Sequence, residues 1–376
     1  MRVKLGDVAT YINGYAFKPS DWSDTGVPII RIQDLTGNSY QANRYNGEYA
    51  KKYEVLPGDV LISWSASLGV YIWAGEKAVL NQHIFKVVFD KCPIDKSFFV
   101  HQVQEILSKA GTSAHGATMK HLTKPVFDAL PFYLPPLNKQ RHIAAVLDKV
   151  SDLIAKRRQQ LDKLDELVKA RFVEMFGDIN VNDKGWRMQP LGELCTIVRG
   201  GSPRPIEKYL GGDVPWIKIG DATDGESIYL HSTKEHIIRE GISKSRMVKA
   251  GSLIFANCGV SLGFARIITF DGCIHDGWLA MEDIDARLDK VFLLQALNQM
   301  TEHFRKIAPT GTQPNLNTAI MKVYKQIIPP MELQKDFIAF IEQTDKSKLA
   351  IQKGMEKLET LKKVLMQEFF GGEKSE

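Results

Sequence analysis

Two patterns of hydrophobic and polar positions alternate along the chain, and each occurs twice. In the first, short apolar and β-branched runs bounded by Gly, Asn or Asp predict strands at residues 27–32, 60–63, 70–73 and 84–89. Apolar residues at helical spacing then predict helices over residues 96–109 and, later in the chain, 288–307. The sequence therefore predicts globular domains of the α/β or α+β class.

The second pattern follows two Pro-Pro pairs, residues 135–136 and 329–330, where apolar residues recur at alternating steps of four and three. This spacing predicts coiled-coil helices, and a glycine just after each stretch, Gly177 and Gly371, predicts its end. The predicted seam comprises Ile143, Leu147, Val150, Ile154, Leu161, Leu164, Val168, Phe337, Ile341, Ile351, Met355, Leu358 and Leu365.

Charged positions differ between the two seams. Arg157 and Arg171 interrupt the first seam where the second has Ile351 and Leu365. This difference favours pairing of the two helices with each other, as an antiparallel coiled coil. The alternative is that each apolar stripe covers only its own domain.

Internal similarity indicates that the whole unit is duplicated. The run at 5–7, Leu-Gly-Asp, returns at 191–193 as Leu-Gly-Glu, and the run at 27–32 returns at 214–219. Gln140 beyond the first Pro-Pro pair returns as Gln334 beyond the second. We expect a pseudo-twofold internal repeat of domain 1–136, helix 137–178, domain 179–330 and helix 331–371, with a tail at 372–376.

Composition and charge leave several partner classes open. The 376 residues are 44% hydrophobic and 25% charged, as in globular proteins, and the net charge of +5 favours polyanionic partners without requiring one. No apolar stretch is long enough for a membrane span or has the form of a signal peptide, so we expect a cytoplasmic protein with no membrane partner. Cys258, Cys273 and His275 could belong to a zinc site, but a fourth ligand is missing.

Motifs for catalysis are missing from the sequence. No lysine follows an acidic residue at the nuclease spacing acid-x-Lys, and no Gly-Lys pair could form a Walker A loop. There is also no Gly-x-Gly-x-x-Gly fingerprint and no Asn-Pro-Pro-aromatic run. We therefore expect no enzyme activity and no catalytic residue, metal or cofactor in this chain.

Particular runs resemble the specificity (S) subunits of type I restriction-modification systems, over nearly the whole chain. These runs are Pro-Trp-Ile-Lys-Ile-Gly-Asp at 215–221, Gly-Thr-Gln-Pro-Asn-Leu-Asn at 311–317, and the helix ends at 175–178 and 368–371. The first copy departs from the pattern, with Ile29 where the second has Trp216 and a different run at 116–122.

The resemblance implies a target recognition domain in each copy, one for each half of a split site in double-stranded DNA. It implies that the helices form a spacer that docks two methyltransferase (M) subunits and, through them, the restriction (R) subunits. S-adenosylmethionine would then belong to the M subunits, and ATP with Mg to the R subunits. A non-enzymatic protein-interaction scaffold with duplicated binding domains is the alternative.

Helix length predicts how far apart the half-sites lie. A seam of 34 residues, 143–176, spans about 50 Å at roughly 1.5 Å per residue, or about 15 base pairs at roughly 3.4 Å each. We expect a bipartite target whose spacer the helices set, with unlike half-sites because the two copies differ most in their loops.

Polar and basic residues on loops that follow strands are the candidate DNA contacts, because such side chains bind phosphates and base edges. For each of them a solvated or turn-stabilising role is the alternative, as it is for the basic run at 156–158. The candidates are Lys18, Arg31, Gln33, Asn81, Gln82, His83, Lys120, His121, Arg204, Lys218, Asn257, His275, Thr312, Gln313, Asn315 and Asn317.

Overall fold

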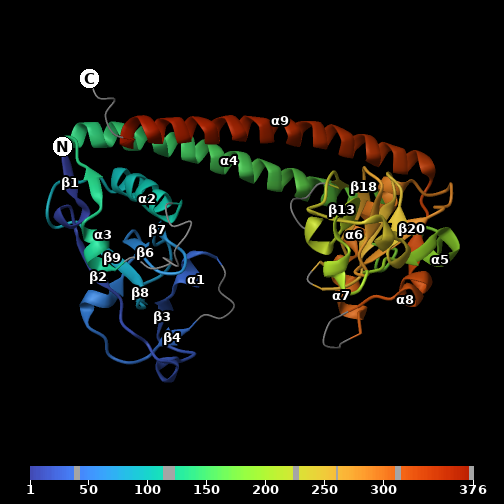
Figure 1. The fold of residues 1–376 in the computed structure, drawn as a ribbon, viewed down its shortest axis with the longest axis horizontal. Helices are drawn as coiled ribbons and strands as arrows, with labels where there is room; N and C mark the ends of the chain where they lie inside the picture. Colours follow the sequence, from blue (N-terminus) through green and yellow to red (C-terminus); the bar gives the residue numbers. More distant parts are fainter. Residues whose placement is uncertain (38–42, 113–122, 223–227, 260, 310–314, 372–376) are drawn as a thin grey trace. The chain divides into compact units, whose positions relative to one another are not determined.

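The computed structural model of the chain (Figure 1) describes residues 1–37, 43–112, 123–222, 228–259, 261–309 and 315–371. The chain divides into two compact units. Unit 1 comprises Met1–Arg157 with Lys353–Glu376, and unit 2 comprises Arg158–Gln352. Each unit contains one globular α+β region and one part of each of two long helices.

Unit 1 has two four-stranded sheets and one short strand pair. The antiparallel sheet has the order β2-β9-β6-β7, with bounds Thr10–Asn13, Ile84–Val88, Val60–Ser63 and Gly69–Ile72. The mixed sheet has the order β4-β3-β8-β5, with bounds Arg44–Tyr45, Val27–Ile30, Ala78–Leu80 and Glu54–Val55. The strand pair is β1-β10, Arg2–Lys4 with Pro131–Tyr133. The helices are α1, Ile32–Leu35; α2, Lys96–Thr112; and α3, Lys124–Asp128, with 3₁₀ turns η1, Leu5–Asp7; η2, Pro19–Asp21; and η3, Lys51–Tyr53.

Unit 2 has corresponding sheets. The larger has the order β12-β20-β17-β18-β14, with bounds Thr196–Arg199, Trp278–Glu282, Leu253–Ala256, Ala265–Ile268 and Tyr229–Leu230. The smaller has the order β15-β13-β19-β16, with bounds Glu235–Ile237, Leu210–Ile217, Gly272–Ile274 and Arg246–Val248. The strand pair is β11-β21, Met188–Pro190 with Lys325–Ile327. The helices are α5, Leu191–Leu194; α6, Lys290–Gln299; α7, Thr301–Ile307; and α8, Thr318–Val323, with 3₁₀ turns η4, Ile206–Lys208; η5, Ile219–Asp221; and η6, Arg239–Lys244.

The strand orders of the two units match position by position. Strands β2, β9, β6 and β7 correspond to β12, β20, β17 and β18, and strands β4, β3, β8 and β5 correspond to β15, β13, β19 and β16. In each mixed sheet one neighbouring pair is parallel, β3 with β8 and β13 with β19. Unit 2 differs by the additional edge strand β14, which runs parallel to β18.

Two long helices follow the Pro-Pro pairs: α4, Leu137–Phe176, and α9, Met331–Phe370. At about 1.5 Å per residue, 40 residues give each a length of about 60 Å. Gly177 ends α4 with a positive φ of 78°, and its N–H donates to the Val173 carbonyl at 2.8 Å. This left-handed cap is the stop that the sequence predicts.

A buried glutamine fixes the beginning of each long helix to its own unit. The Gln140 amide accepts from the Asp95 N–H at 2.9 Å, just before α2, and donates to the Pro135 carbonyl at 2.8 Å. Gln334 likewise accepts from the Asp289 N–H at 2.8 Å, at the start of α6, and donates to the Pro329 carbonyl at 2.8 Å. The repeated glutamine thus joins the long helix to the first turn of a domain helix.

Aromatic residues in each unit pack the long helices onto the globular core. In unit 1, Ile143 and Leu147 of α4 and Met366 of α9 share one buried cluster with Phe98 and Phe99 of α2. In unit 2, Phe172 of α4 lies with its ring centroid 5.4 Å from that of Phe337 of α9 and 5.8 Å from that of Phe292 of α6. All predicted seam residues are buried or half-buried.

One polar layer interrupts the apolar contacts between the long helices in unit 2. The Lys348 ammonium of α9 forms an ion pair with the Asp165 carboxylate of α4, and both side chains are largely buried. Of the two arginines at seam positions, Arg157 is exposed, and the Arg171 guanidinium lies 5.9 Å from the Phe340 ring centroid. The Arg171 side chain stays 40% exposed, and its guanidinium also pairs with Glu174 at 2.8 Å.

Two predicted elements differ from the structure. The run at 288–307 is two helices, α6 and α7, because the chain breaks at Met300. There the Thr301 hydroxyl donates to the Asn298 carbonyl at 2.9 Å, and side-chain bonds of this kind compete with the helical pattern. The predicted strand 27–32 ends at Ile30, because Ile32 already begins α1.

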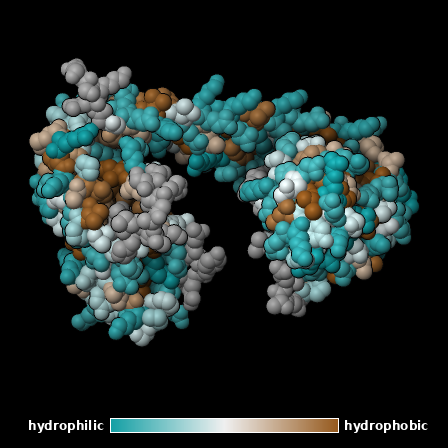
Figure 2. Space-filling model, in the orientation of Figure 1, coloured by the Kyte–Doolittle hydropathy of each residue, from teal (hydrophilic) through white to brown (hydrophobic). Residues whose placement is uncertain are grey.

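The face of the molecule drawn in Figure 2 is largely hydrophilic, with scattered hydrophobic patches. Within the described ranges, none of the helices combines the length and the apolar character that crossing a membrane requires. The basic run at 156–158 is exposed on α4.

Candidate nucleic-acid interface

In each unit some of the predicted contact residues lie together where two parallel strands end side by side. Ile30 of β3 pairs with Leu80 of β8, so the next residues, Arg31 and Asn81, are neighbours at one sheet edge. Gln82 and His83 continue this edge, and all four side chains are half-buried. Neighbouring parallel strands end at the same edge, which brings residues 50 positions apart together.

The corresponding edge in unit 2 carries different side chains. Ile217 of β13 pairs with Ile274 of β19, which makes Lys218 and His275 neighbours. The Trp216 ring lies 5.5 Å from the His275 ring and 5.7 Å from the Lys218 ammonium. An aromatic ring thus lies beside both polar groups of this edge.

Matching backbone hydrogen bonds show that the two edges share one framework. The Asn81 N–H donates to the Ile30 carbonyl at 3.1 Å, as the His275 N–H donates to the Ile217 carbonyl at 3.0 Å. Gly14 and Gly200 each cross the edge so closely that a Cβ would lie 2.0 Å from the Asn81 carbonyl oxygen or 2.2 Å from that of His275. The backbone is therefore held equivalently, while the exposed side chains differ.

Cations cluster around His275 in unit 2. Arg199 donates to the Asp276 carbonyl at 3.0 Å, and the Arg204 guanidinium, whose side chain is 80% exposed, lies 3.8 Å from the Asp276 carboxylate. Burial lowers the pKa of His275, the charges of Lys218, Arg204 and Arg199 lower it further, and Asp276 opposes them. These cations attract a polyanion to this edge.

The hydrogen bonding of His275 orients its ring. Nδ1 lies 2.9 Å from the Gly277 N–H, from which it can accept, and 3.0 Å from the Asp276 carboxylate, to which it can donate only when protonated. A neutral ring is the form that the lowered pKa favours. The contacts of Nδ1 therefore orient the ring, and the tautomer decides whether Nε2 donates or accepts at a base edge or a phosphate.

The pKa of His275 predicts a pH effect on stability. Because the folded-state pKa lies below the unfolded value of about 6.5, the unfolded chain binds more protons as the pH falls through that value. The contribution of neutral His275 to the free energy of unfolding is therefore fully present above this pH and declines below it. We expect the difference in thermal midpoint, wild type minus His275→Asn, to shrink between about pH 7.5 and about pH 5.5. A difference that stays constant or grows on acidification would contradict this assignment.

One predicted contact at each edge, Arg31 in unit 1 and Lys218 in unit 2, has a partner inside its own unit. The Arg31 N–H donates to Asp34 at 2.8 Å, its side chain is only 13% exposed, and its Nε lies 3.3 Å from the same carboxylate. The Lys218 N–H donates to Asp221 at 2.8 Å, and its ammonium pairs with Glu235. The repeated acidic residue thus caps the turn after the strand, and each cation has an internal partner.

The remaining predicted contacts fall into three groups. Lys18 and Gln33 are exposed, and Asn315 is half-buried. Asn317 caps α8 by accepting from the Ile320 N–H at 2.9 Å, and Asn257 is 0% exposed. Lys120, His121, Thr312 and Gln313 lie outside the described residues.

Sequence reasoning missed three residues of these edges. Arg199 and Asp276 belong to the cluster around His275 in unit 2, and Tyr15 bridges to Asn81 in unit 1. The repeated glycines gave a usable signal, because Gly14 and Gly200 each stand next to one of these residues in the sequence. Tyr15 follows Gly14, and Arg199 precedes Gly200.

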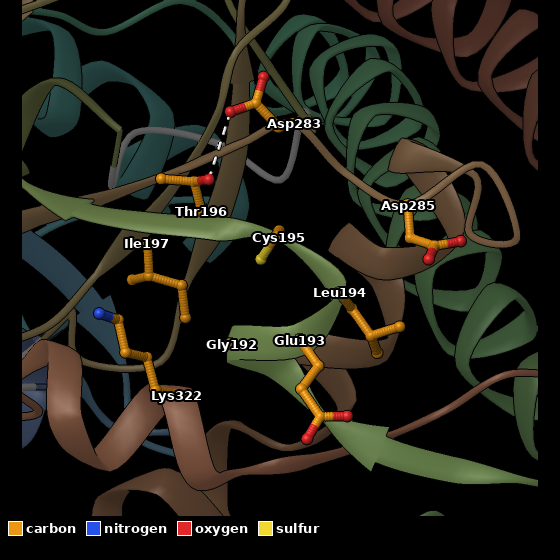
Figure 3. Close-up of a pocket in the computed structure, with 9 residues that line it drawn as sticks. All are labelled: Gly192, Glu193, Leu194, Cys195, Thr196, Ile197, Asp283, Asp285 and Lys322. Carbon is orange, nitrogen blue, oxygen red and sulfur yellow. Dashed lines mark hydrogen bonds between the residues drawn. The ribbon is translucent and has the colours of Figure 1, made fainter.

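A pocket of about 370 Å³ lies at the other end of β12 from Arg199 (Figure 3). Its lining includes the carboxylates of Glu193, Asp283 and Asp285, and Asp283 accepts from the Thr196 hydroxyl at 3.2 Å. Carboxylates repel phosphates, so this pocket does not suit nucleic acid. Among the described residues no three His, Cys, Asp or Glu side chains form a metal-binding group, and Cys258, Cys273 and His275 do not form one.

The two units thus share one backbone framework and carry different cationic and amide side chains at its edges. The chain belongs to the family of the type I restriction modification DNA specificity domain, whose profile matches residues 1–166 and 183–363.

Individual relatives agree with this assignment. The chain is 31% identical over 172 residues to the EcoBI specificity subunit of Escherichia coli, a match that covers 45% of this chain and 36% of that protein. It is 22% identical over 391 residues to the MjaVIII specificity subunit of Methanocaldococcus jannaschii, covering 97% of this chain and 90% of that one.

One solved structure has the same fold. It is described as the structural basis underlying complex assembly and conformational transition of the type I R-M system. A chain in it superposes with a TM-score of 0.61 at 17% identity, covering 98% of this chain and 97% of that chain.

Proposed function

We propose that this chain is the DNA sequence-recognition subunit of a type I restriction-modification complex. Unit 1 and unit 2 each read one half of a bipartite, asymmetric target in double-stranded DNA. The observation that carries the proposal is the pair of equivalent strand edges with unlike side chains, Asn81 and Gln82 in one and His275 and Asp276 in the other. Equal frameworks with different donors and acceptors are what two different half-sites require.

The long helices are proposed to pair antiparallel as the spacer between the half-sites. In unit 1 the early α4 residues Ile143 and Leu147 share a core with the late α9 residue Met366. In unit 2 the late α4 residue Phe172 contacts the early α9 residue Phe337. An antiparallel arrangement is supported by both sets of contacts.

The outer faces of the long helices are proposed to dock two methyltransferase subunits and, through them, the restriction subunits. Six apolar side chains on these helices are 40–52% exposed, although the seam is already covered: Leu153, Leu167, Val173, Leu349, Leu361 and Val364. Exposed apolar groups on helices that bury another stripe suit a protein partner. S-adenosylmethionine, ATP and Mg would be bound by those partners.

The test is methylome sequencing of cells that express the chain with its methyltransferase partner. We expect a bipartite, non-palindromic motif. Insertion of seven residues after Gln159 in α4 and after Ile351 in α9 keeps the seam pattern and adds about 10 Å. The spacer of the motif should lengthen by about three base pairs, at roughly 3.4 Å each, while both half-sites stay the same.

The matched control is the same insertion in α4 alone, which leaves the helices of unequal length and should abolish the modified motif. An unchanged motif after the double insertion, or a palindromic motif in the wild type, would refute the proposal. Absence of DNA binding in the presence of the methyltransferase would favour the interaction scaffold instead.

A further inference from the structure

Tyr15 is an exposed aromatic residue at the unit 1 edge. Its side chain is 46% exposed, and among the described residues its hydroxyl has no hydrogen-bond partner. Its backbone is fixed on both sides of Asn81: the Tyr15 N–H donates to the Leu80 carbonyl at 2.8 Å, and its carbonyl accepts from the Gln82 N–H at 2.8 Å. The backbone of Tyr15 is therefore fixed beside Asn81 and Gln82 of the candidate interface, and its ring is exposed.

Other rings hold the Tyr15 side chain in place. The Phe17 ring meets it edge to face with the centroids 4.9 Å apart, and the Tyr53 ring lies 5.6 Å away. Phe17 is itself buried and contacts Tyr45 at 5.0 Å. Because these neighbouring rings already restrict the Tyr15 side chain, it loses little conformational freedom when a ligand packs on its exposed surface.

Two lysines lie at the Tyr53 side of this ring cluster. Lys51 and Lys52 are exposed on η3, and the Lys52 ammonium lies 4.9 Å from the centroid of the Tyr53 ring. Glu54, the acidic residue next to η3, is paired with Lys77 at 2.7 Å and so contributes little repulsion. The cluster thus offers an aromatic face with adjacent cations to a negatively charged ligand.

Unit 2 has no ring at the equivalent position. The Gly201 N–H donates to the Ile274 carbonyl at 3.0 Å, as the Tyr15 N–H does to Leu80, which makes Gly201 the counterpart of Tyr15. The aromatic group is therefore a feature of one unit and not of the shared framework.

We propose that Tyr15 packs its ring against a base of the half-site read by unit 1, with Lys51 and Lys52 on the adjoining phosphates. This inference rests on the proposed function and names a specificity-determining residue within it. The face of a base in duplex DNA is covered by the neighbouring base pairs, so contact with the Tyr15 ring requires the two stacked base pairs to separate locally. Unit 1 therefore reads how easily the DNA deforms as well as its base edges. Unit 2, with Gly201, reads its half-site without this contribution.

The test measures Kd of the methyltransferase complex for a duplex carrying the motif found by methylome sequencing, at one fixed salt concentration. Tyr15→Ala should raise Kd by about tenfold, and Tyr15→Phe, which keeps the ring, by less than about twofold. Trp22→Ala, which removes an equally exposed ring of unit 1, is the matched control and should leave Kd unchanged. Equal losses in Tyr15→Ala and Tyr15→Phe, or no loss in Tyr15→Ala, would overturn the proposal.

Base substitutions locate the contact. A changed base in the unit 1 half-site should raise the Kd of Tyr15→Ala by a smaller factor than the Kd of the wild type. A changed base in the unit 2 half-site should raise both Kd values by the same factor. The proposal would be overturned if the Kd values of wild type and Tyr15→Ala differed in their response to base changes by the same factor at both half-sites. If the wild-type complex shows no site-specific binding, the proposed function fails and not only this inference.

A measurement on the wild type avoids any effect of the variants on folding. With 5-iododeoxyuridine placed in turn at each position of the unit 1 half-site, irradiation should crosslink at least one position to the peptide that contains Tyr15. Crosslinks that form only to other peptides would overturn the proposal.

Discussion

Phe172→Ala is expected to lower the free energy of unfolding of unit 2 by about 3–5 kcal/mol, the range for removing a fully buried phenylalanine. Its side chain is 1% exposed, and its ring contacts those of Phe176, Phe292 and Phe337. The substitution leaves a cavity where α4, α6 and α9 meet. Denaturant unfolding of the full chain measures the effect.

The control for this prediction lies on the same helix. Leu167 is 48% exposed, so Leu167→Ala should change the free energy of unfolding by no more than about 0.5 kcal/mol. A Phe172→Ala protein within about 1 kcal/mol of the wild type would show that the aromatic cluster does not anchor the helix.

Gly200→Ala is expected to destabilise unit 2 by about 3 kcal/mol and to abolish recognition of its half-site. The new Cβ would lie 2.2 Å from the carbonyl oxygen of His275, and this contact involves backbone, which cannot rotate away. The strand edge must open, so His275 loses its position. Thermal unfolding and the methylome of the assembled complex provide the two measurements.

Gly354→Ala on α9 is the matched control, because a Cβ added at this glycine would meet no atom within 4 Å. Alanine favours a helix over glycine by about 1 kcal/mol, so this variant should be at least as stable as the wild type and keep its motif. Retention of both half-sites by Gly200→Ala would contradict the importance of the close backbone crossing.

The repeated framework could largely be predicted from the sequence, because its signals are local. The four-three spacing after each Pro-Pro pair and Gly177 predicted α4 closely. The repeated Gln140 and Gln334 marked positions whose buried hydrogen bonds explain the repetition. The break between α6 and α7 at Met300 was not predicted, because the apolar spacing of the sequence continues through it.

Much of the candidate site could not be predicted, because its properties arise from distant contacts. Arg31 and Lys218 have the chemistry of DNA contacts, yet each has an acidic partner that only the fold brings near. Asn257 is buried, although its place directly after the strand Leu253–Ala256 resembles that of the other predicted contacts. Nothing in the sequence marks Tyr15 as exposed, and only the fold brings it beside Asn81.

The buried glutamines at the starts of the long helices restrict how such a chain can change its spacer. Gln140 and Gln334 fix the rotational phase of each helix relative to its own unit. An α-helix turns about 100° per residue, so one inserted residue would turn everything beyond it by about that angle. Length changes that preserve orientation therefore come in steps of about seven residues, and the spacings available to descendants of this protein form a discrete series.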